Sequence, residues 1–86
     1  MRALQLLSRS WCHLCDDMLA AARPLADLAG VEIEVIDVDG DATLEARWGE
    51  LVPVLLADNG EELCHYHLDE AALRAYLARF PIESAD

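Results

Sequence analysis

Several residue types are scarce in this chain of 86 residues, and each shortage excludes some classes of function. Lysine is absent and the only strong bases are six arginines, whereas Asp and Glu together number 17, which gives a formal net charge of -11. A chain this acidic is repelled by nucleic-acid phosphates and by anionic lipid. We therefore expect neither nucleic acid nor a membrane among its partners.

Long apolar runs are also missing. No stretch approaches the roughly 18 residues that a membrane span needs. The apolar start over residues 1–7 is too short for a secretory signal. Without export we expect a cytoplasmic protein, in a compartment that keeps thiols reduced. Three cysteines, an odd number, do not suit a structural disulfide framework.

The sequence contains no internal repeat, no low-complexity segment and no linker, and its length leaves room for one domain. Slightly more than half of the residues are apolar, which is enough for a single modest core. We predict one domain over residues 1–86 that acts as a monomer, with residues 82–86 as a frayed tail.

Hydrophobic periodicity divides the first half of the chain into a strand, a helix and a second strand. The apolar run Arg2–Leu7 predicts a buried strand. Apolar residues recur at three- and four-residue steps over Cys12–Ala29, which predicts a helix stopped by Gly30. Pro24 is expected to kink or split that helix. Alternating apolar and acidic residues predict a strand with one buried face over Val31–Asp37.

Turn residues divide the second half of the chain. The predicted elements are, in chain order, a helix capped by Asp41 and ending near Trp48 or Gly49, a strand over residues 53–57, a tight turn over residues 58–60, a strand over residues 61–68, and a helix capped by Asp69 and ended by Pro81. The apolar face of that last helix consists of Ala72, Leu73, Tyr76, Leu77 and Phe80.

The predicted element order is βαβαββα. The first β-α-β unit implies a parallel pair of strands with a right-handed crossover, and the last two strands form a hairpin. The fold class is therefore α/β, with a four-stranded mixed sheet flanked by helices.

The strongest local signal is the segment Trp11–Cys15, which contains a Cys-x-x-Cys motif between the first strand and the first helix. Cys12 is expected at the helix N-terminus, where free backbone N–H groups and the helix dipole favour a thiolate. Such positions lower the pKa of a cysteine to roughly 3.5–7.5. Cys15 lies one turn later, within reach of a mixed disulfide on Cys12. This arrangement predicts a redox pair.

Charged side chains around the two cysteines have opposite effects on the stability of the thiolate. Arg9 and, when protonated, His13 would add positive potential that favours the thiolate, whereas Asp16 and Asp17 place negative charge within a turn of the sulfurs. Trp11 is expected to be a partly exposed residue at the rim beside the thiol, where it would contact a partner protein.

Two segments together resemble glutaredoxins and their small bacterial glutaredoxin-like relatives. They are Ser8–Cys15 after the first strand and Leu51–Leu55 at the start of the third, and the resemblance extends from Arg2 to about Phe80. It implies a thioredoxin-like fold and a thiol–disulfide oxidoreductase that transfers electrons between sulfurs without a bound cofactor. Cys12 would be the exposed nucleophile and Cys15 the buried resolving thiol.

The resemblance also implies contacts with the substrate, which would be a thiol or disulfide protein, or glutathione as a co-substrate. Val52–Pro53 would be a cis peptide bond facing the redox pair, with the Val52 backbone docking the substrate. Arg9 would contact a glutathione carboxylate, or be a solvated arginine. Asp69 would hold the γ-glutamyl end, or be a plain helix cap.

One segment departs from the family pattern. Glutaredoxins usually carry Gly-Gly before the last helix, whereas this chain has His65–Leu68 there. Side chains at these positions would either block glutathione or line a different pocket. Cys64 is expected to be a small buried residue on this strand.

Two alternatives of other classes remain open. In the first, Cys12 and Cys15 form half of a zinc site completed by Cys64 and a histidine such as His67. Residues three apart in a strand point to opposite faces, which disfavours that site. In the second, the chain is a non-catalytic thioredoxin-like domain that only binds a partner protein.

Overall fold

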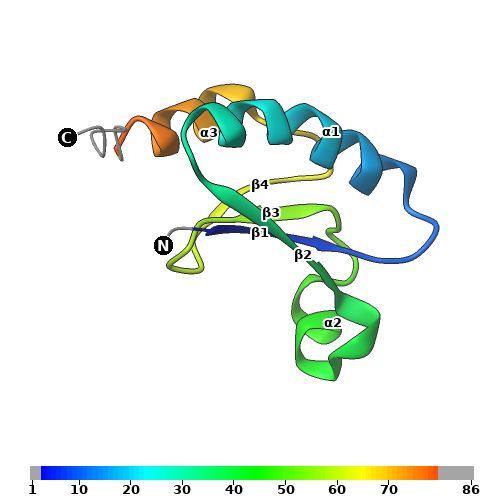
Figure 1. Ribbon diagram of the computed structural model, residues 1–86. Helices are drawn as coiled ribbons and strands as arrows, with labels where there is room; N and C mark the ends of the chain where they lie inside the picture. The colour runs from blue at the N-terminus through cyan, green and yellow to red at the C-terminus, as the bar shows by residue number, and fades with distance from the viewer. Residues whose placement is uncertain (1–2, 80–86) are drawn as a thin grey trace.

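The apolar runs of this chain form a four-stranded sheet between helices in the computed structural model, which describes residues 3–79 (Figure 1). The elements are, in chain order, β1 (Ala3–Ser8), α1 (His13–Leu28), β2 (Glu32–Asp37), the 3₁₀ helix η1 (Val38–Gly40), α2 (Ala42–Trp48), β3 (Val54–Leu56), β4 (Glu62–His65) and α3 (Glu70–Leu77). This confirms the predicted order βαβαββα, with η1 added in the turn before α2.

The strands lie in the order β2-β1-β3-β4. β1 and β2 are parallel, β3 is antiparallel to β1, and β4 is antiparallel to β3. The β3–β4 hairpin closes through residues 58–60, where the Gly60 N–H donates to the carbonyl of Ala57. Gly60 has a φ of 92°, a left-handed conformation that glycine adopts without strain. The predicted mixed sheet is therefore confirmed.

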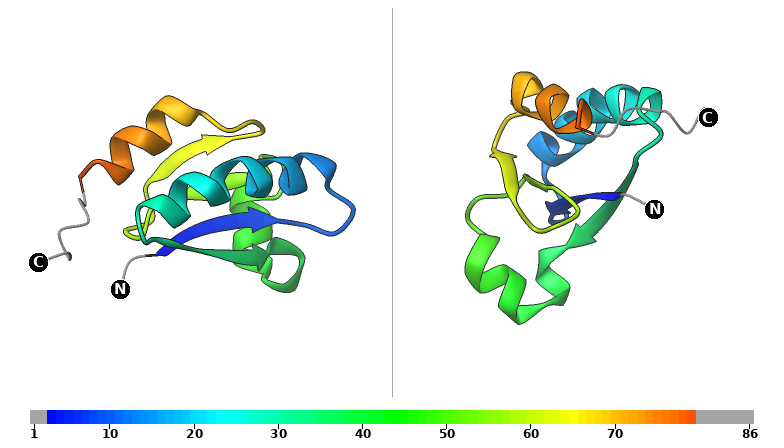
Figure 2. Two further views of the ribbon diagram at one scale, coloured as in Figure 1. Left: turned by 45° about the horizontal axis from the view of Figure 1, so that its top comes forward. Right: turned by 90° about the vertical axis from the view of Figure 1, so that its left-hand side faces the viewer.

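Helices cover both faces of the sheet: α1 and α3 lie side by side on one face and α2 lies on the other (Figures 1 and 2). Neighbouring residues of a strand point to opposite faces, so Leu6 of β1 packs toward α1 and α3 while Leu7 packs toward α2. β3 alternates in the same way, which is why its three residues are all apolar and buried.

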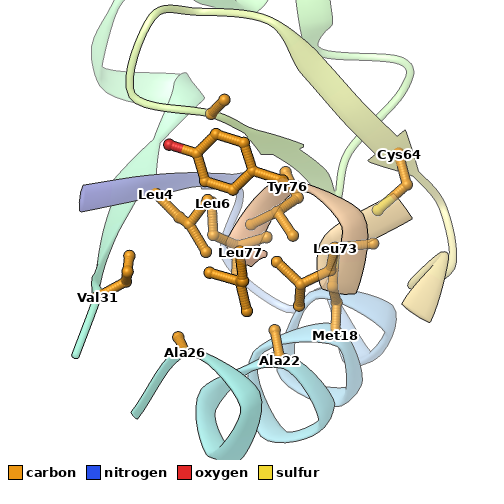
Figure 3. Packing of buried hydrophobic residues seen from close by; sticks show 12 residues of the cluster. Leu4, Leu6, Met18, Ala22, Ala26, Val31, Cys64, Leu73, Tyr76 and Leu77 are labelled. Atoms are coloured by element: carbon orange, nitrogen blue, oxygen red, sulfur yellow. The ribbon is translucent and has the colours of Figure 1, made fainter. Parts of the chain in front are cut away.

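The larger core cluster fills the space between the sheet and the helix pair α1 and α3 (Figure 3). Its buried residues are Leu4, Leu6, Met18, Ala22, Ala26, Val31, Leu55, Ala57, Cys64, Leu73, Tyr76 and Leu77. Tyr76 also ties α3 to the hairpin turn, because its hydroxyl donates to a carboxylate oxygen of Asp58 at 2.7 Å. This cluster holds α1, and with it the Cys-x-x-Cys motif, firmly against β1.

Two details differ from the sequence prediction. α1 runs without a break from His13 to Leu28, so the split is wrong, and the kink that Pro24 predicts as the other possibility stays a prediction. Pro24 and Ala20, whose carbonyl the missing N–H would have met, are both exposed, and water can take the free acceptor. Val35 is 49% exposed although the alternation predicts it on a buried face, because β2 is an edge strand and its neighbours cover only part of it.

No helix within residues 3–79 is long and apolar enough to cross a membrane. The predicted positions of Phe80, Pro81 and residues 82–86, like that of Arg2, lie outside the described residues.

Candidate active site

The Cys-x-x-Cys motif lies at the junction between the β1–α1 connection and the first turn of α1. Cys12 is the N-cap of α1, with extended backbone angles, and its sulfur accepts a hydrogen bond from the Cys15 N–H at 3.1 Å. The two Cα atoms are 5.2 Å apart and the two sulfurs are at disulfide-bonding distance. Cys15 is only 4% exposed, whereas Cys12 is half-buried. An incoming sulfur therefore meets Cys12 first.

The electrostatic setting of Cys12 comes mainly from the backbone. The free N–H groups of the first turn of α1 and the helix dipole favour negative charge on the N-cap sulfur. Arg9 contributes less than its position suggests, because one guanidinium nitrogen pairs with Asp39 at 3.2 Å and with Glu45 at 3.3 Å. Its charge is thus shared with two carboxylates rather than directed at the sulfur.

Arg9 instead connects β1 to the elements beneath the sheet, since Asp39 belongs to η1 and Glu45 to α2. The guanidinium approaches the backbone so closely at Gly49 that a Cβ there would lie 2.9 Å from its Nη2 atom and 2.5 Å from the Glu45 carbonyl. The Glu45 carbonyl, a backbone atom that cannot move aside, is what favours glycine at position 49. The predicted contact of Arg9 with a glutathione carboxylate stays a prediction.

The peptide bond Val52–Pro53 is cis, as the resemblance implied. Pro53 is buried and Val52 is half-buried. The ladder of β3 begins at Val54, opposite Leu7 of β1, so Val52 lies outside the ladder and beside the segment that leads from β1 to Cys12. The Val52 backbone is thus outside the β3 ladder, and its predicted docking of a substrate stays a prediction.

β4 ends at His65, so the predicted strand over residues 61–68 is too long. Tyr66 turns the chain with a left-handed φ of 67°. Its N–H donates to the Pro53 carbonyl at 2.8 Å, and its hydroxyl donates to the Glu50 carbonyl at 3.1 Å. These two bonds replace further pairing with β3. They also break the period-two alternation that a strand over residues 61–68 would have.

The turn at Tyr66 creates a cavity that sequence reasoning missed. It has a volume of about 190 Å³ and is lined by Leu14, Asp17, Met18 and Ala21 of α1 and by Tyr66, His67 and Leu68. The only sequence signal for it was the replacement of Gly-Gly by bulky residues. A larger hollow of about 500 Å³ lies between the C-terminal part of α1 and the start of β2, remote from the cysteine pair.

The remaining predicted site residues differ in their exposure and in the contacts that they make. Trp11 is 98% exposed with a left-handed φ of 64°, so it projects fully into solvent rather than lying partly covered at the rim. His13 is exposed in the first turn of α1. Asp69 caps α3 by accepting the Ala72 N–H at 3.0 Å, as predicted for a helix cap. Whether it also holds glutathione stays a prediction.

Cys64 lies in β4, paired with Leu55 and buried in the larger core cluster, as predicted. Burial raises the pKa of its thiol above the ordinary value, and the charges of Asp69 and Glu62 raise it further, while a hydrogen bond from the Asp69 backbone opposes them. Within residues 3–79, no three His, Cys, Asp or Glu side chains are grouped so as to hold a metal ion. A zinc site on Cys12, Cys15 and Cys64 thus has no preformed cluster in its favour.

Comparisons with known proteins agree with this geometry. The family described as "Glutaredoxin-like domain (DUF836)" matches residues 3–78. An uncharacterized protein of Mycobacterium tuberculosis is 35% identical over 81 residues, covering 88% of this chain and 82% of the relative. The solution structure of a Nitrosomonas europaea protein is 43% identical, with a TM-score of 0.79, covering 87% of this chain and 89% of that one.

A mutant thioredoxin from Halobacterium salinarum is also similar in structure. It has a TM-score of 0.64 and 25% identity, and the match covers 92% of this chain and 74% of the thioredoxin. The predicted thioredoxin-like fold is therefore confirmed.

Proposed function

This chain belongs to the glutaredoxin-like domain family, and we propose that it is a thiol–disulfide oxidoreductase with Cys12 and Cys15 as its redox pair. The observation that carries the proposal is the placement of two sulfurs at disulfide-bonding distance at the N-terminus of α1, beside a cis Val52–Pro53 bond. Fold and motif thus support the same chemistry.

The proposed reaction needs only sulfur chemistry. In the reduced protein the Cys12 thiolate attacks one sulfur of a substrate disulfide, and the other substrate sulfur leaves as a thiolate that takes up a proton. The Cys15 thiolate then attacks the Cys12 sulfur of this mixed disulfide and releases the second substrate thiol. Two electrons pass to the substrate and the Cys12–Cys15 disulfide remains. No bound cofactor takes part.

The surrounding residues support these steps in different ways. The Cys15 N–H bond to the Cys12 sulfur stabilises negative charge on the attacking atom. The Val52 backbone would pair with the substrate chain on the other side of the sulfurs, and the exposed side chains of Trp11 and His13 would contact it. In this proposal the protein works as a monomer in the reducing cytoplasm, where reduced thiols are maintained.

The first prediction is a reversible two-electron redox transition of the Cys12–Cys15 pair. We would equilibrate the protein in glutathione redox buffers and count free thiols by mass tagging. Wild type and the matched control Cys64→Ala should both give the transition, at a potential in the range of roughly -120 to -270 mV. Cys12→Ser should abolish it. If both thiols stay free across the whole range, the redox function is wrong and a binding domain remains.

Two further measurements distinguish the roles of Cys12 and Cys15 and test the zinc alternative. Cys15→Ser should trap a mixed disulfide on Cys12, because the resolving thiol is gone. Trapping on Cys15 in the reciprocal variant, Cys12→Ser, would reverse the assigned roles. Metal analysis of the purified protein tests the zinc alternative, which one zinc ion per chain would support.

A further inference from the structure

The cavity between α1 and residues 66–68, here called the Leu14 cavity, combines an apolar floor with a carboxylate. The floor consists of Leu14, Met18, Ala21 and Leu68, and Asp17 lies at the edge among the lining residues. Met18 is buried in the core, which makes the floor part of the rigid structure. A long cationic side chain suits such a surface, because its aliphatic stem packs on apolar groups while its charged head reaches the carboxylate.

Asp17 carries the negative charge at this cavity, and His67 is the only basic side chain in its described lining. The carboxylate of Asp17 is exposed and forms no hydrogen bond or ion pair with any other of the residues that the structure describes. Within that part of the chain no arginine lines the cavity. The nearest arginine in sequence, Arg23, lines the larger hollow at the C-terminal part of α1 instead, and Arg9 is already paired with Asp39 and Glu45. A cation from outside therefore finds a carboxylate without a competing partner.

The opposite wall is held in place before any ligand arrives. Tyr66 is fixed through its backbone N–H to Pro53 and through its hydroxyl to Glu50. Its left-handed backbone turns the following residues, His67 and Leu68, toward α1. Figure 2 shows this segment between β4 and α3 beside the first turns of α1. The cavity is thus a preformed feature, which lowers the entropic cost of binding.

The distance between Cys12 and Asp17 determines how many residues would separate the cationic side chain of a substrate from its reactive cysteine. Asp17 is five residues after Cys12 on α1, which is about 7 Å along the helix axis. An extended chain advances about 3.4 Å per residue. A substrate chain that runs along α1 from a cysteine bonded to Cys12 would therefore bring its second residue level with Asp17.

We propose that the Leu14 cavity binds an arginine or lysine side chain of a polypeptide substrate, two or three residues from the cysteine that joins Cys12. This inference rests on the proposed redox function and adds its substrate class: proteins whose reactive cysteine is followed or preceded by a basic residue. The side chains that replace Gly-Gly before α3 then select a substrate rather than merely obstruct glutathione.

The test uses two symmetrical peptide disulfides that differ in one residue. Each peptide carries a single cysteine, with arginine two residues away in one and the uncharged isostere citrulline in the other. Reduced full-length protein converts each disulfide to two peptide thiols in one turnover, so no second reductant is needed. The readout is the ratio of the two second-order rate constants, by acid quench and chromatography.

We expect wild type to prefer the arginine peptide, and Asp17→Asn to lower that preference roughly threefold, the size of an exposed ion pair. Asp16→Asn is the matched control, because it removes the same charge from the same helix turn outside the cavity. It should keep the preference, which also separates the cavity from long-range attraction. Ala21→Leu, which fills the floor and changes no charge, should lose preference as Asp17→Asn does.

Three results would overturn the inference. Equal rates for both peptides with wild type would leave the redox function intact and remove the substrate class. The same loss in Asp16→Asn and Asp17→Asn would assign the preference to overall charge. An unchanged preference in Ala21→Leu would mean that no side chain enters the cavity. If wild type reduces neither peptide, the proposed redox function itself fails and the substrate class falls with it.

Discussion

The three cysteines of this chain have the same side chain and very different surroundings. Cys12 is half-buried at the N-terminus of α1, Cys15 is buried behind it, and Cys64 is enclosed in the core beneath α3. A helix N-terminus favours the thiolate form, whereas an apolar core favours the thiol. The same residue type therefore serves as a reactive group at one position and as a packing group at another.

A prediction at the residue scale concerns the pH dependence contributed by Cys64. Because burial raises the pKa of this thiol above its ordinary value of 9.0, the folded state keeps the proton to a higher pH than the unfolded chain. The resulting stabilisation is complete below about pH 9 and is lost as the pH rises through the folded-state pKa. Wild type should thus lose unfolding free energy above about pH 9 faster than Cys64→Ala.

Urea unfolding of the oxidised proteins measures this difference, since Cys12 and Cys15 do not titrate in a disulfide. Tyrosines are common to both proteins, so their titration cancels in the comparison. Parallel pH profiles for the two proteins would contradict the prediction and indicate that Cys64 ionises as easily in the folded state as in the unfolded chain.

Arg9 shows what residue-scale reasoning from sequence overlooks. Its position three residues before Cys12 suggested an effect on the thiol, and the resemblance suggested a ligand contact. In the structure its guanidinium pairs with Asp39 and Glu45, which are far from it in sequence. Only the packing of η1 and α2 beneath β1 brings these carboxylates to it, and no local pattern encodes that packing.

At the scale of elements, α1 is continuous although it contains a proline. Pro24 has no N–H to donate to the Ala20 carbonyl, and this lost bond falls on the exposed side of the helix. The buried side, with Met18, Ala22 and Ala26 in the core, keeps the helix intact. Tertiary packing has overridden the local tendency of proline to interrupt a helix. The sequence predicted a kink or a split because only that local tendency is visible in it.

The element-scale prediction follows from that lost bond. Pro24→Ala restores the N–H and should raise the free energy of unfolding by about 1 to 2 kcal/mol, less than the full helix-propensity difference because proline also restricts the unfolded chain. Chemical denaturation measures the change. Arg23→Ala, at the neighbouring exposed position, is the control and should shift stability by no more than about 0.5 kcal/mol. A loss of stability in Pro24→Ala would mean that the packing of α1 requires the proline.

The whole molecule carries a formal net charge of -11, and this charge affects every encounter with a charged substrate. Long-range repulsion slows the approach of anions at low salt and is screened as salt increases, because the Debye length falls from about 30 Å at 0.01 M to about 10 Å at 0.1 M. The effect is independent of the Leu14 cavity, since it depends on total charge rather than on one carboxylate.

The prediction at this scale is a rate that rises with salt for an anionic disulfide. The second-order rate constant of the reduced protein with oxidised glutathione should increase roughly twofold or more between 10 and 200 mM sodium chloride. Hydroxyethyl disulfide, which is uncharged, is the control and should react at a constant rate. A glutathione rate that does not change with salt would show that the charge near Cys12 is locally balanced.

The sequence by itself determined the order of elements, the mixed sheet, the caps Asp41 and Asp69, and the placement of Cys12 and Cys15 at a helix start. These depend on periodicity, turn residues and short-range hydrogen bonds, all of which are local. The cis bond at Val52–Pro53 came from family resemblance, because local preferences favour trans.

Three features were decided only by the tertiary structure. They are the length of β4, the ion-pair partners of Arg9, and the residues that His67 and Leu68 face. Each depends on atoms distant in sequence: the Tyr66 N–H meets the Pro53 carbonyl, Arg9 meets two carboxylates beneath the sheet, and residues 66–68 meet α1. Chain folding creates these contacts by bringing remote segments together. The reactive pair was therefore readable from the sequence, whereas the cavity beside it exists only in the folded chain.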